Sequence, residues 1–214
     1  MRRLGGIRVG PQLRSSGRSW RQERFATIDL ELTGLDPKRD RIVSFGVVPI
    51  VDGEVRLDRA EYRLVAPEVA SRAEAVAVHR LRPIDLADAP SFLAVRSALR
   101  RALDGSVPLA WAGFVEAAFL ARAIGGRAGT WLRRILDVQL LTIHLDHLEG
   151  RDPSPAAEAS LADTAARFGV PPEEEHHALS DAFVTGELFL IVATRLERRG
   201  IGSVRGLLDV GRGR

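Results

Sequence analysis

The sequence predicts a single domain of the α/β class, with a mixed sheet that three antiparallel strands begin and that strand–helix alternation then extends. Three observations predict this class. The chain has 214 residues and is 45% hydrophobic, enough for one core. Two β-branched, apolar runs meet at Asp52-Gly53, a typical two-residue hairpin turn. After Pro67, segments with helical spacing of apolar residues surround one more short apolar run.

The individual elements follow from these patterns, taken in chain order. The expected strands are 25–32 (FATIDLEL), 41–50 (RIVSFGVVPI), 55–65 (VRLDRAEYRLV) and 107–112 (VPLAWA). The expected helices are 71–78, 91–103, 115–124, 136–148, 160–169 and 178–200. The fifth of these begins with a capping-box pattern, Ser160 to Asp163, and the last is the longest. We therefore expect helices to flank the mixed sheet.

The two ends of the chain are basic. Residues 1–24 hold seven Arg against one acid, a net of +6, so residues 25–214 come to 3 − 6 = −3. The stretch from Arg195 onward holds six Arg against two acids, a net of +4. We expect residues 1–22 to be a flexible basic arm, 23–200 the domain, and 201–214 a basic tail. Such ends suit contact with polyanions, although 30 of the 31 basic residues are Arg, which a GC-rich coding sequence would also give.

Composition excludes several classes of site. The chain has no cysteine, so disulfides, thiolate metal sites and a cysteine nucleophile are ruled out. No uninterrupted apolar run approaches the roughly 20 residues needed to cross a bilayer, so no membrane partner is expected. The first 20 residues carry charge but no apolar segment typical of a secretory signal. We expect a cytoplasmic protein.

Two carboxylates lie two residues apart in the first strand, at Asp29 and Glu31. Residues i and i+2 of a strand point to the same side, so these like charges stand about 6–7 Å apart. A hard divalent cation with oxygen ligands, Mg²⁺ or Mn²⁺, would relieve their repulsion. The alternative is an exposed edge strand whose acids are solvated. The Gly34 that follows would allow close approach to a ligand.

A second polar stretch, EEEHHALSDAF, precedes and opens the longest predicted helix. It places Asp181 at the helix start, five residues after His176. An imidazole with an ordinary pKa near 6.5 is suited to accept a proton from water at neutral pH. The alternative is an N-terminal cap followed by surface histidines.

Together the two stretches resemble the DEDDh exonucleases, the superfamily that includes the proofreading epsilon subunit of bacterial DNA polymerase III. The matching residues are Asp29, Glu31, Thr33, Gly34 and Leu35, followed by His176, Ala178 and Asp181. The resemblance covers about residues 24–199 and implies a ribonuclease H-like fold. Its spacing selects His176 rather than His177 as the general base.

The family's middle motif, His-Asn-x-x-Phe-Asp-x-x-Phe-Leu, corresponds here to WAGFVEAAFL, residues 111–120. Phe119 and Leu120 match, Glu116 stands where the family has Asp, and Trp-Ala replaces His-Asn. Glutamate keeps the charge and adds one methylene. The alternative is an ordinary acid in a first helical turn, favoured by the helix dipole.

The resemblance implies a two-metal 3′→5′ exonuclease that releases nucleoside monophosphates from single-stranded DNA or RNA ends. Asp29 would bridge two Mg²⁺ or Mn²⁺ ions, Glu31 and Asp181 would complete the first site, and Glu116 would serve the second. Thr33, Gly34 and Leu35 would line the pocket for the terminal nucleotide. A DNA polymerase is a possible partner. The rival hypothesis is a weakly active or inactive subunit of the same fold that binds nucleic acid or a polymerase.

Five other polar residues give weaker signals. His144, Asp146 and His147 fit an exposed helix face better than a metal site. His79 lies near the place where relatives have a His-Gly turn, and Asp137 begins a helix and is expected to cap it.

Overall fold

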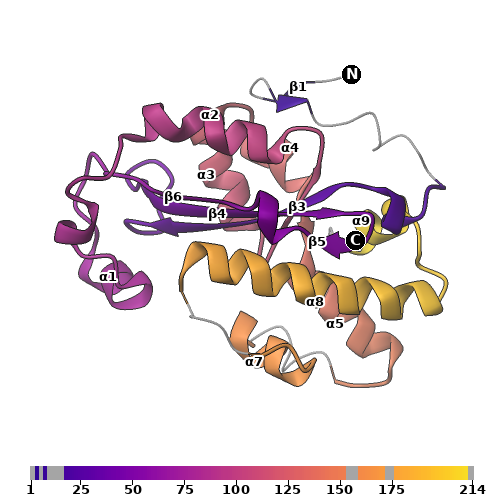
Figure 1. Ribbon diagram of the computed structural model, residues 1–214. Coiled ribbons are helices and arrows are strands. Elements are labelled where there is room, and N and C mark those ends of the chain that lie inside the picture. Colours follow the sequence, from indigo (N-terminus) through magenta and orange to yellow (C-terminus); the bar gives the residue numbers. More distant parts are fainter. Residues whose placement is uncertain (1–2, 5–6, 9–16, 153–158, 172–175, 212–214) are drawn as a thin grey trace.

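The computed structural model describes residues 3–4, 7–8, 17–152, 159–171 and 176–211. Its main sheet lies between two layers of helices (Figure 1). The strands are β1 (Arg3–Leu4), β2 (Ile7–Arg8), β3 (Phe25–Leu32), β4 (Ile42–Val51), β5 (Glu54–Val55), β6 (Glu61–Leu64), β7 (Val107–Ala110) and β8 (Leu136–Asp137). The helices are α1 (Ala73–His79), α2 (Phe92–Leu103), α3 (Phe114–Ile124), α4 (Ala128–Leu132), α5 (Val138–Leu148), α7 (Leu161–Arg167), α8 (Ala178–Arg198) and α9 (Val204–Val210). The mixed α/β class predicted from the sequence is confirmed.

The main sheet has the order β5-β4-β3-β7-β8, and β6 also pairs with β4. β3 runs antiparallel to β4 and parallel to β7. The hairpin between β4 and β5 turns on Asp52 and Gly53, both at positive φ, as a type I′ turn requires. The expected third strand, 55–65, is instead two short strands separated by a 3-10 turn at Leu57–Arg59. Both pieces pair with β4, so the antiparallel arrangement is kept.

Each face of the sheet carries its own apolar core. On one face, Ile28, Leu30 and Phe45 pack with residues of α2 and α3 and with Trp131 of α4. On the other face, α5, α8 and α9 cover Phe25 and other apolar residues of the sheet. Figure 1 shows α2, α3 and α4 above the sheet and α8, α5 and α7 below it. The two layers remove both faces from water, and burial of this apolar surface stabilises the fold.

The segments next to both chain ends belong to the second core. Trp20 is 1% exposed and packs edge-on against Phe189, with 5.6 Å between ring centroids. Its backbone N–H donates to the Gly202 carbonyl oxygen at 3.1 Å. The stretch from residue 201, expected to be a basic tail, forms α9 up to Val210, with Leu207 fully buried. The N-terminal residues 9–16 and the last three residues lie outside the described part, so the expected arm is only partly visible.

No helix in the described ranges is both long enough and apolar enough to cross a membrane. The longest, α8, has 21 residues and carries charged side chains along its length.

Candidate active site

Asp29 and Glu31 lie on the central strand β3, pointing to the same side as their spacing predicts. Asp29 is partly buried and Glu31 is 8% exposed. Their partners on β4 are Gly46 and Ser44. The register shifts between Glu31 and the next residue, so the regular ladder ends just beyond the two acids. The pair is therefore held by the middle of the sheet and not by an exposed edge.

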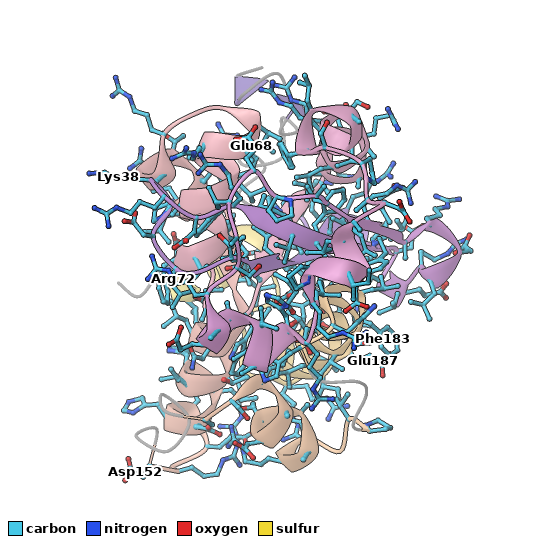
Figure 2. The ribbon with its side chains drawn as sticks, turned by 90° about the vertical axis from the view of Figure 1, so that its left-hand side faces the viewer. Lys38, Glu68, Arg72, Asp152, Phe183 and Glu187 are labelled. Carbon is cyan, nitrogen blue, oxygen red and sulfur yellow. The ribbon has the colours of Figure 1, made fainter. Side chains whose placement is uncertain are left out.

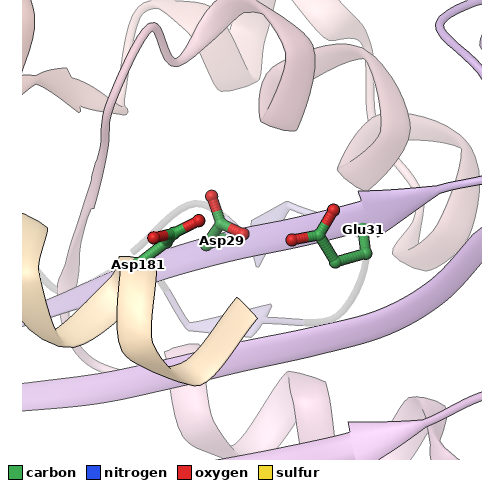
Figure 3. A group of neighbouring side chains, drawn as sticks. All are labelled: Asp29, Glu31 and Asp181. Atoms are coloured by element: carbon green, nitrogen blue, oxygen red, sulfur yellow. The ribbon is translucent and has the colours of Figure 1, made fainter. Parts of the chain in front are cut away.

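Asp181 reaches the same place from the first turn of α8. A glycine on β4 makes this possible, because a Cβ at Gly46 would lie 2.2 Å from the Ala178 carbonyl oxygen. Only a residue without a side chain lets the start of α8 approach the sheet so closely. Since Gly46 is the cross-strand partner of Asp29, the contact brings Asp181 to Asp29. The three acids converge in Figure 3.

Asp29, Glu31 and Asp181 can each offer one carboxylate oxygen such that all three oxygens lie within 4.8 Å of one another. Burial raises the pKa of Asp29 well above its usual value, and the charges of Glu116, Glu31 and Asp181 raise it further. Burial and then Asp181 raise the pKa of Glu31 to about 8. Like charges gathered in a poorly solvated place favour either bound protons or a cation. A donor set made only of oxygens fits Mg²⁺ or Mn²⁺.

Glu116 lies in the first turn of α3 and is 5% exposed, but it is not a member of the three-residue group within 4.8 Å. Burial raises its pKa to about 8, and the charges of Asp137 and Glu31 add to the rise. Its Oε2 is buried with no hydrogen-bond partner. Such an oxygen is costly unless protonated or bound to a cation. Glu116 is therefore coupled to the cluster through its charge while standing outside its innermost group.

The start of α3 is fixed by Asp137, which the sequence placed at a helix start. Its Oδ2 accepts the Gly113 N–H at 2.9 Å, and its Oδ1 accepts the Leu140 N–H at 3.2 Å as the N-cap of α5. Ala112 has a φ of 52°, a left-handed conformation that is uncommon for alanine. It occupies the position of Asn in the family motif, a residue that tolerates this conformation better. Asp137 therefore caps α5, as expected, and it also holds the start of α3 through Gly113.

His176 precedes α8 with a φ of 57°, and its backbone N–H donates to Asp181 Oδ2 at 3.1 Å. Its side chain is exposed, beside the acids. His177 differs: its ring stacks on Tyr62, with 4.5 Å between centroids, and its Nδ1 lies 3.5 Å from the Ser180 hydroxyl. Of the two imidazoles, that of His177 contacts Tyr62 and lies near Ser180, whereas that of His176 is exposed.

The three residues after the strand have different surroundings. Thr33 is fully buried, and its hydroxyl donates to Asp40 Oδ1 at 3.3 Å and accepts the Arg41 N–H at 2.9 Å. Thr33 therefore stabilises the turn that follows β3. Gly34 and Leu35 line a cavity of about 590 Å³ together with Glu31, and Leu35 is 76% exposed. Of the residues expected to hold a terminal nucleotide, these two lie at the open space beside the acids.

The same cavity has His79 in its wall, a residue whose role the sequence left open. His79 is 5% exposed, its Nδ1 accepts the Leu81 N–H at 3.0 Å, and its Nε2 is buried without a hydrogen-bond partner. Burial lowers its pKa, and the nearby His176 lowers it further. Because Nδ1 accepts, the neutral ring carries its proton on Nε2. The only sequence signal for this residue was its place near the family's His-Gly turn.

The fold and the acidic cluster together define an α/β protein of the ribonuclease H-like architecture with a candidate divalent-metal site. A family model described as Exonuclease matches residues 27–189, and the chain belongs to this family.

Relatives agree with this membership. The chain is 30% identical over 181 residues to a DNA polymerase III subunit epsilon-like protein of Rhodobacter capsulatus, covering 83% of this chain and 25% of that protein. It is 26% identical over 193 residues to a PolC-type DNA polymerase III of Thermotoga petrophila, covering 86% and 13%. The chain thus spans a quarter or less of the length of these two relatives.

Solved structures share the fold. Exonuclease X in complex with 5′ overhanging duplex DNA superposes with a TM-score of 0.60 at 24% identity, covering 87% of this chain and 99% of that one. Exonuclease I of E. coli in complex with a dA16 oligonucleotide gives a TM-score of 0.67 at 17% identity, covering 88% and 42%. At these identities the likeness concerns the fold alone.

Proposed function

We propose that this protein is a metal-dependent exonuclease that removes nucleoside monophosphates from the 3′ end of a single-stranded nucleic acid. The observation that carries the proposal is the convergence of Asp29, Glu31 and Asp181 within 4.8 Å on a fold of the exonuclease family. No cation among the described side chains is paired with Asp29 or Glu31, so their charge must be offset by bound protons or a bound cation. We expect the protein to act in the cytoplasm.

The donor set suits two Mg²⁺ or Mn²⁺ ions. Asp29, Glu31 and Asp181 would hold the first, and the unpartnered Glu116 Oε2, which stands apart, would serve the second. When bound, such ions supply activation of a water nucleophile and stabilise charge on the leaving oxygen. The protein's own share is to hold four acids in place on β3, α3 and α8. Metal binding would displace the protons that their raised pKa values favour.

The proton from the attacking water would pass to the imidazole of His176. The backbone N–H of this residue donates to Asp181 at 3.1 Å, and its exposed ring would turn toward the cluster. The terminal nucleotide would occupy the cavity of about 590 Å³ beside Glu31, with Gly34 and Leu35 in its wall. A single-stranded end is favoured because the terminal residue must separate from a partner strand to enter.

The test is digestion of matched DNA and RNA oligonucleotides labelled at the 5′ end, in Mn²⁺, in Mg²⁺ and in EDTA. We expect a ladder that shortens one nucleotide at a time only with metal, and no cleavage when the 3′ end is chemically blocked. Asp29→Asn should abolish the ladder and leave the fold intact. Asp88→Asn, a change of an exposed acid outside the site, is the matched control. Equal digestion by wild type and Asp29→Asn would refute the proposal.

A second candidate is a subunit with little or no turnover that binds nucleic acid or a polymerase. Two observations favour it: Glu116 stands outside the innermost acidic group, and the relatives are described as DNA polymerase III proteins. The same assay decides between the two, because binding of the oligonucleotide without metal-dependent shortening would support this second function.

A further inference from the structure

A second cavity, of about 520 Å³, lies on the other side of the turn that carries Gly34. The start of β4, residues 65–68, the start of α2 and the end of α3 form its walls. We call it the arginine pocket because Arg41, Arg96 and Arg122 line it. Glu68, at its rim, is labelled in Figure 2, on the same face as Lys38 and Arg72.

The arginine pocket combines an apolar lining with an excess of positive charge. Phe92 and Phe119 contribute aromatic surface, and the three arginines face only two acids, Asp40 and Glu68. Asp40 is already paired with Arg72, which lies outside the lining, at 3.2 Å. Planar guanidinium groups bind phosphate through bidentate hydrogen bonds and also stack on bases. The lining therefore suits a ligand that is part aromatic and part anionic.

Two features of the pocket wall, the Arg96 side chain and the start of α2, could each receive an anion. The Nε of Arg96 is buried without a hydrogen bond, and no ion pair involving Arg96 is found in the described part of the chain. The start of α2, at Ser91 and Phe92, also lines the pocket, and no side chain caps it. The positive end of the dipole of this 12-residue helix attracts anions. Both features point to a phosphate.

The arginine pocket borders the cavity beside the acids. Asp40 lines the first, and Gly34 and Arg72 line the second. A Cβ at Gly34 would lie 2.5 Å from Asp40 Oδ2, so the turn and the Asp40–Arg72 pair lie between the two spaces. A chain molecule with its end beside Glu31 would pass over this turn to reach the arginine pocket.

We propose that the arginine pocket binds an upstream nucleotide of the single strand whose 3′ end occupies the site. The phosphate would meet Arg96 and the start of α2, and the base would lie against the apolar lining. This inference rests on the proposed function. Continuity with the site cavity favours the strand itself over an acidic protein segment, which would have no reason to adjoin the acids.

The test measures binding separately from cleavage. The affinity of the intact chain for a fluorescent dodecanucleotide is measured in EDTA over a range of salt concentrations. Arg96→Gln is compared with Arg101→Gln, an exposed arginine of the same helix that does not line the pocket. We expect Arg96→Gln to weaken dodecanucleotide binding roughly 5-fold and to lower the salt slope by about 0.7, the value for one phosphate contact of a single strand.

Several outcomes would overturn the inference. The first is that the wild type does not bind the dodecanucleotide, and the second is that Arg96→Gln binds it with unchanged affinity. The third is an equal loss of affinity in both variants, which would indicate that any loss of positive charge on α2 weakens binding. Competition by a polyglutamate peptide as effective as the dodecanucleotide would assign the pocket to an acidic protein partner instead. If binding depends on Arg96 but the protein shows no metal-dependent cleavage, the proposed function is wrong, whereas the assignment of the arginine pocket as a nucleic-acid site is retained.

Discussion

The acids of the candidate site and the buried Asp146 at the end of α5 have pKa values shifted in opposite directions. In the candidate site, burial and neighbouring acids raise the pKa values of Asp29, Glu31 and Glu116. At the end of α5, Asp146 is 1% exposed, and burial would raise its pKa, but hydrogen bonds from Arg167 and Arg151 outweigh burial and lower it. Those bonds measure 2.8 and 2.7 Å.

The difference separates a structural acid from the acids that we propose to be functional. The chain supplies its own cations to Asp146, so that charge links α5 to α7 and stabilises the fold. Among the described residues it supplies none to Asp29 and Glu31, so bound protons or an external cation must offset the cost of gathering them. An acid cluster that lacks internal compensation is a candidate site, whereas one that has it is part of the scaffold.

The largest effect should come from exchanging acids for amides in both places. Asp181→Asn should lower metal-dependent cleavage at least ~1000-fold, because a ligand charge is lost. Asp146→Asn should leave the rate per folded molecule within about 3-fold, because it lies outside the acid cluster. Cleavage rates measured at a temperature where both variants are folded check this. A comparable loss of rate in both would erase the distinction.

Gly46→Ala should disturb the acids of the candidate site and leave the surroundings of Asp146 unchanged. The added Cβ would lie 2.2 Å from the Ala178 carbonyl oxygen, so the start of α8 must move away from the sheet. We expect a loss of about 3 kcal/mol in the free energy of unfolding, at the upper end for overpacking, and a marked loss of Mn²⁺ affinity. Denaturant unfolding and calorimetric Mn²⁺ titration are the measurements. Gly105→Ala, at a glycine with open space around it, is the control for metal affinity.

Asp146→Asn should also show how much the ion pairs of Asp146 with Arg151 and Arg167 contribute to stability. Removing one partner of a buried ion pair is costly, but the side chains of Arg151 and Arg167 are 43% and 38% exposed and can turn to water. We therefore expect a loss of about 2 kcal/mol in the free energy of unfolding. Urea unfolding in EDTA measures it, with Asp163→Asn, an exposed acid of α7, for comparison. No loss would mean that the arginines contribute nothing there.

The pH dependence of metal-free stability should sharpen the contrast. Glu31 and Glu116 have ordinary pKa values of 4.5 and folded-state values of about 8. The folded state thus holds more protons between these values, and stability falls as the pH rises from about 4.5 to 8. Asp146 has a lowered pKa, so its contribution is complete above 3.8 and lost only in acid.

Glu116→Gln isolates this effect. The substitution should raise the free energy of unfolding in EDTA by on the order of 1 kcal/mol at about pH 8.5 and change it little at about pH 5. Unfolding curves of wild type and variant at the two pH values give the difference. A gain that is the same at both would show that Glu116 does not titrate in this range. Added Mn²⁺ should stabilise the wild type more at the higher pH, because it need not displace protons there.

The smallest effect concerns backbone conformation. Near Asp146 the left-handed positions are glycines, Gly150 and Gly169, whereas near the candidate site they are Ala112 and His176. The site therefore carries strain that the scaffold cluster lacks. Ala112→Gly should relieve it and raise the free energy of unfolding by about 0.5 kcal/mol, because the conformation costs glycine nothing. Thermal unfolding checks this, and a destabilised variant would contradict it.

Local patterns predicted much of the molecule. The alternation of strand and helix signals gave the fold class, and the i, i+2 spacing of Asp29 and Glu31 gave their common side. Helix α7 begins as expected, with the Ser160 hydroxyl accepting the Asp163 N–H at 3.0 Å. The place of Asp181 beside the pair came from the family motif, because no local rule brings together residues about 150 positions apart.

What escaped prediction depends on contacts between distant segments. Asp146 was expected on an exposed face, and this was wrong, since α7 and residue 151 bring arginines over it. Helix α9 was not recognised because it is short and Gly200, Gly202 and Gly206 interrupt its neighbourhood. The close approach at Gly46 can be known only once α8 lies on β4. The distance of Glu116 from the innermost group likewise depends on the packing of α3.

The burial of Trp20 has a practical consequence for shortening the chain. A version that starts at residue 23 would omit the indole that covers Phe189, along with the Arg21 guanidinium 3.1 Å from Glu197. It would also lose the hydrogen bond to Gly202 that anchors the approach to α9. Trimming should therefore stop before residue 18, and poor expression of a shorter version would say nothing about catalysis.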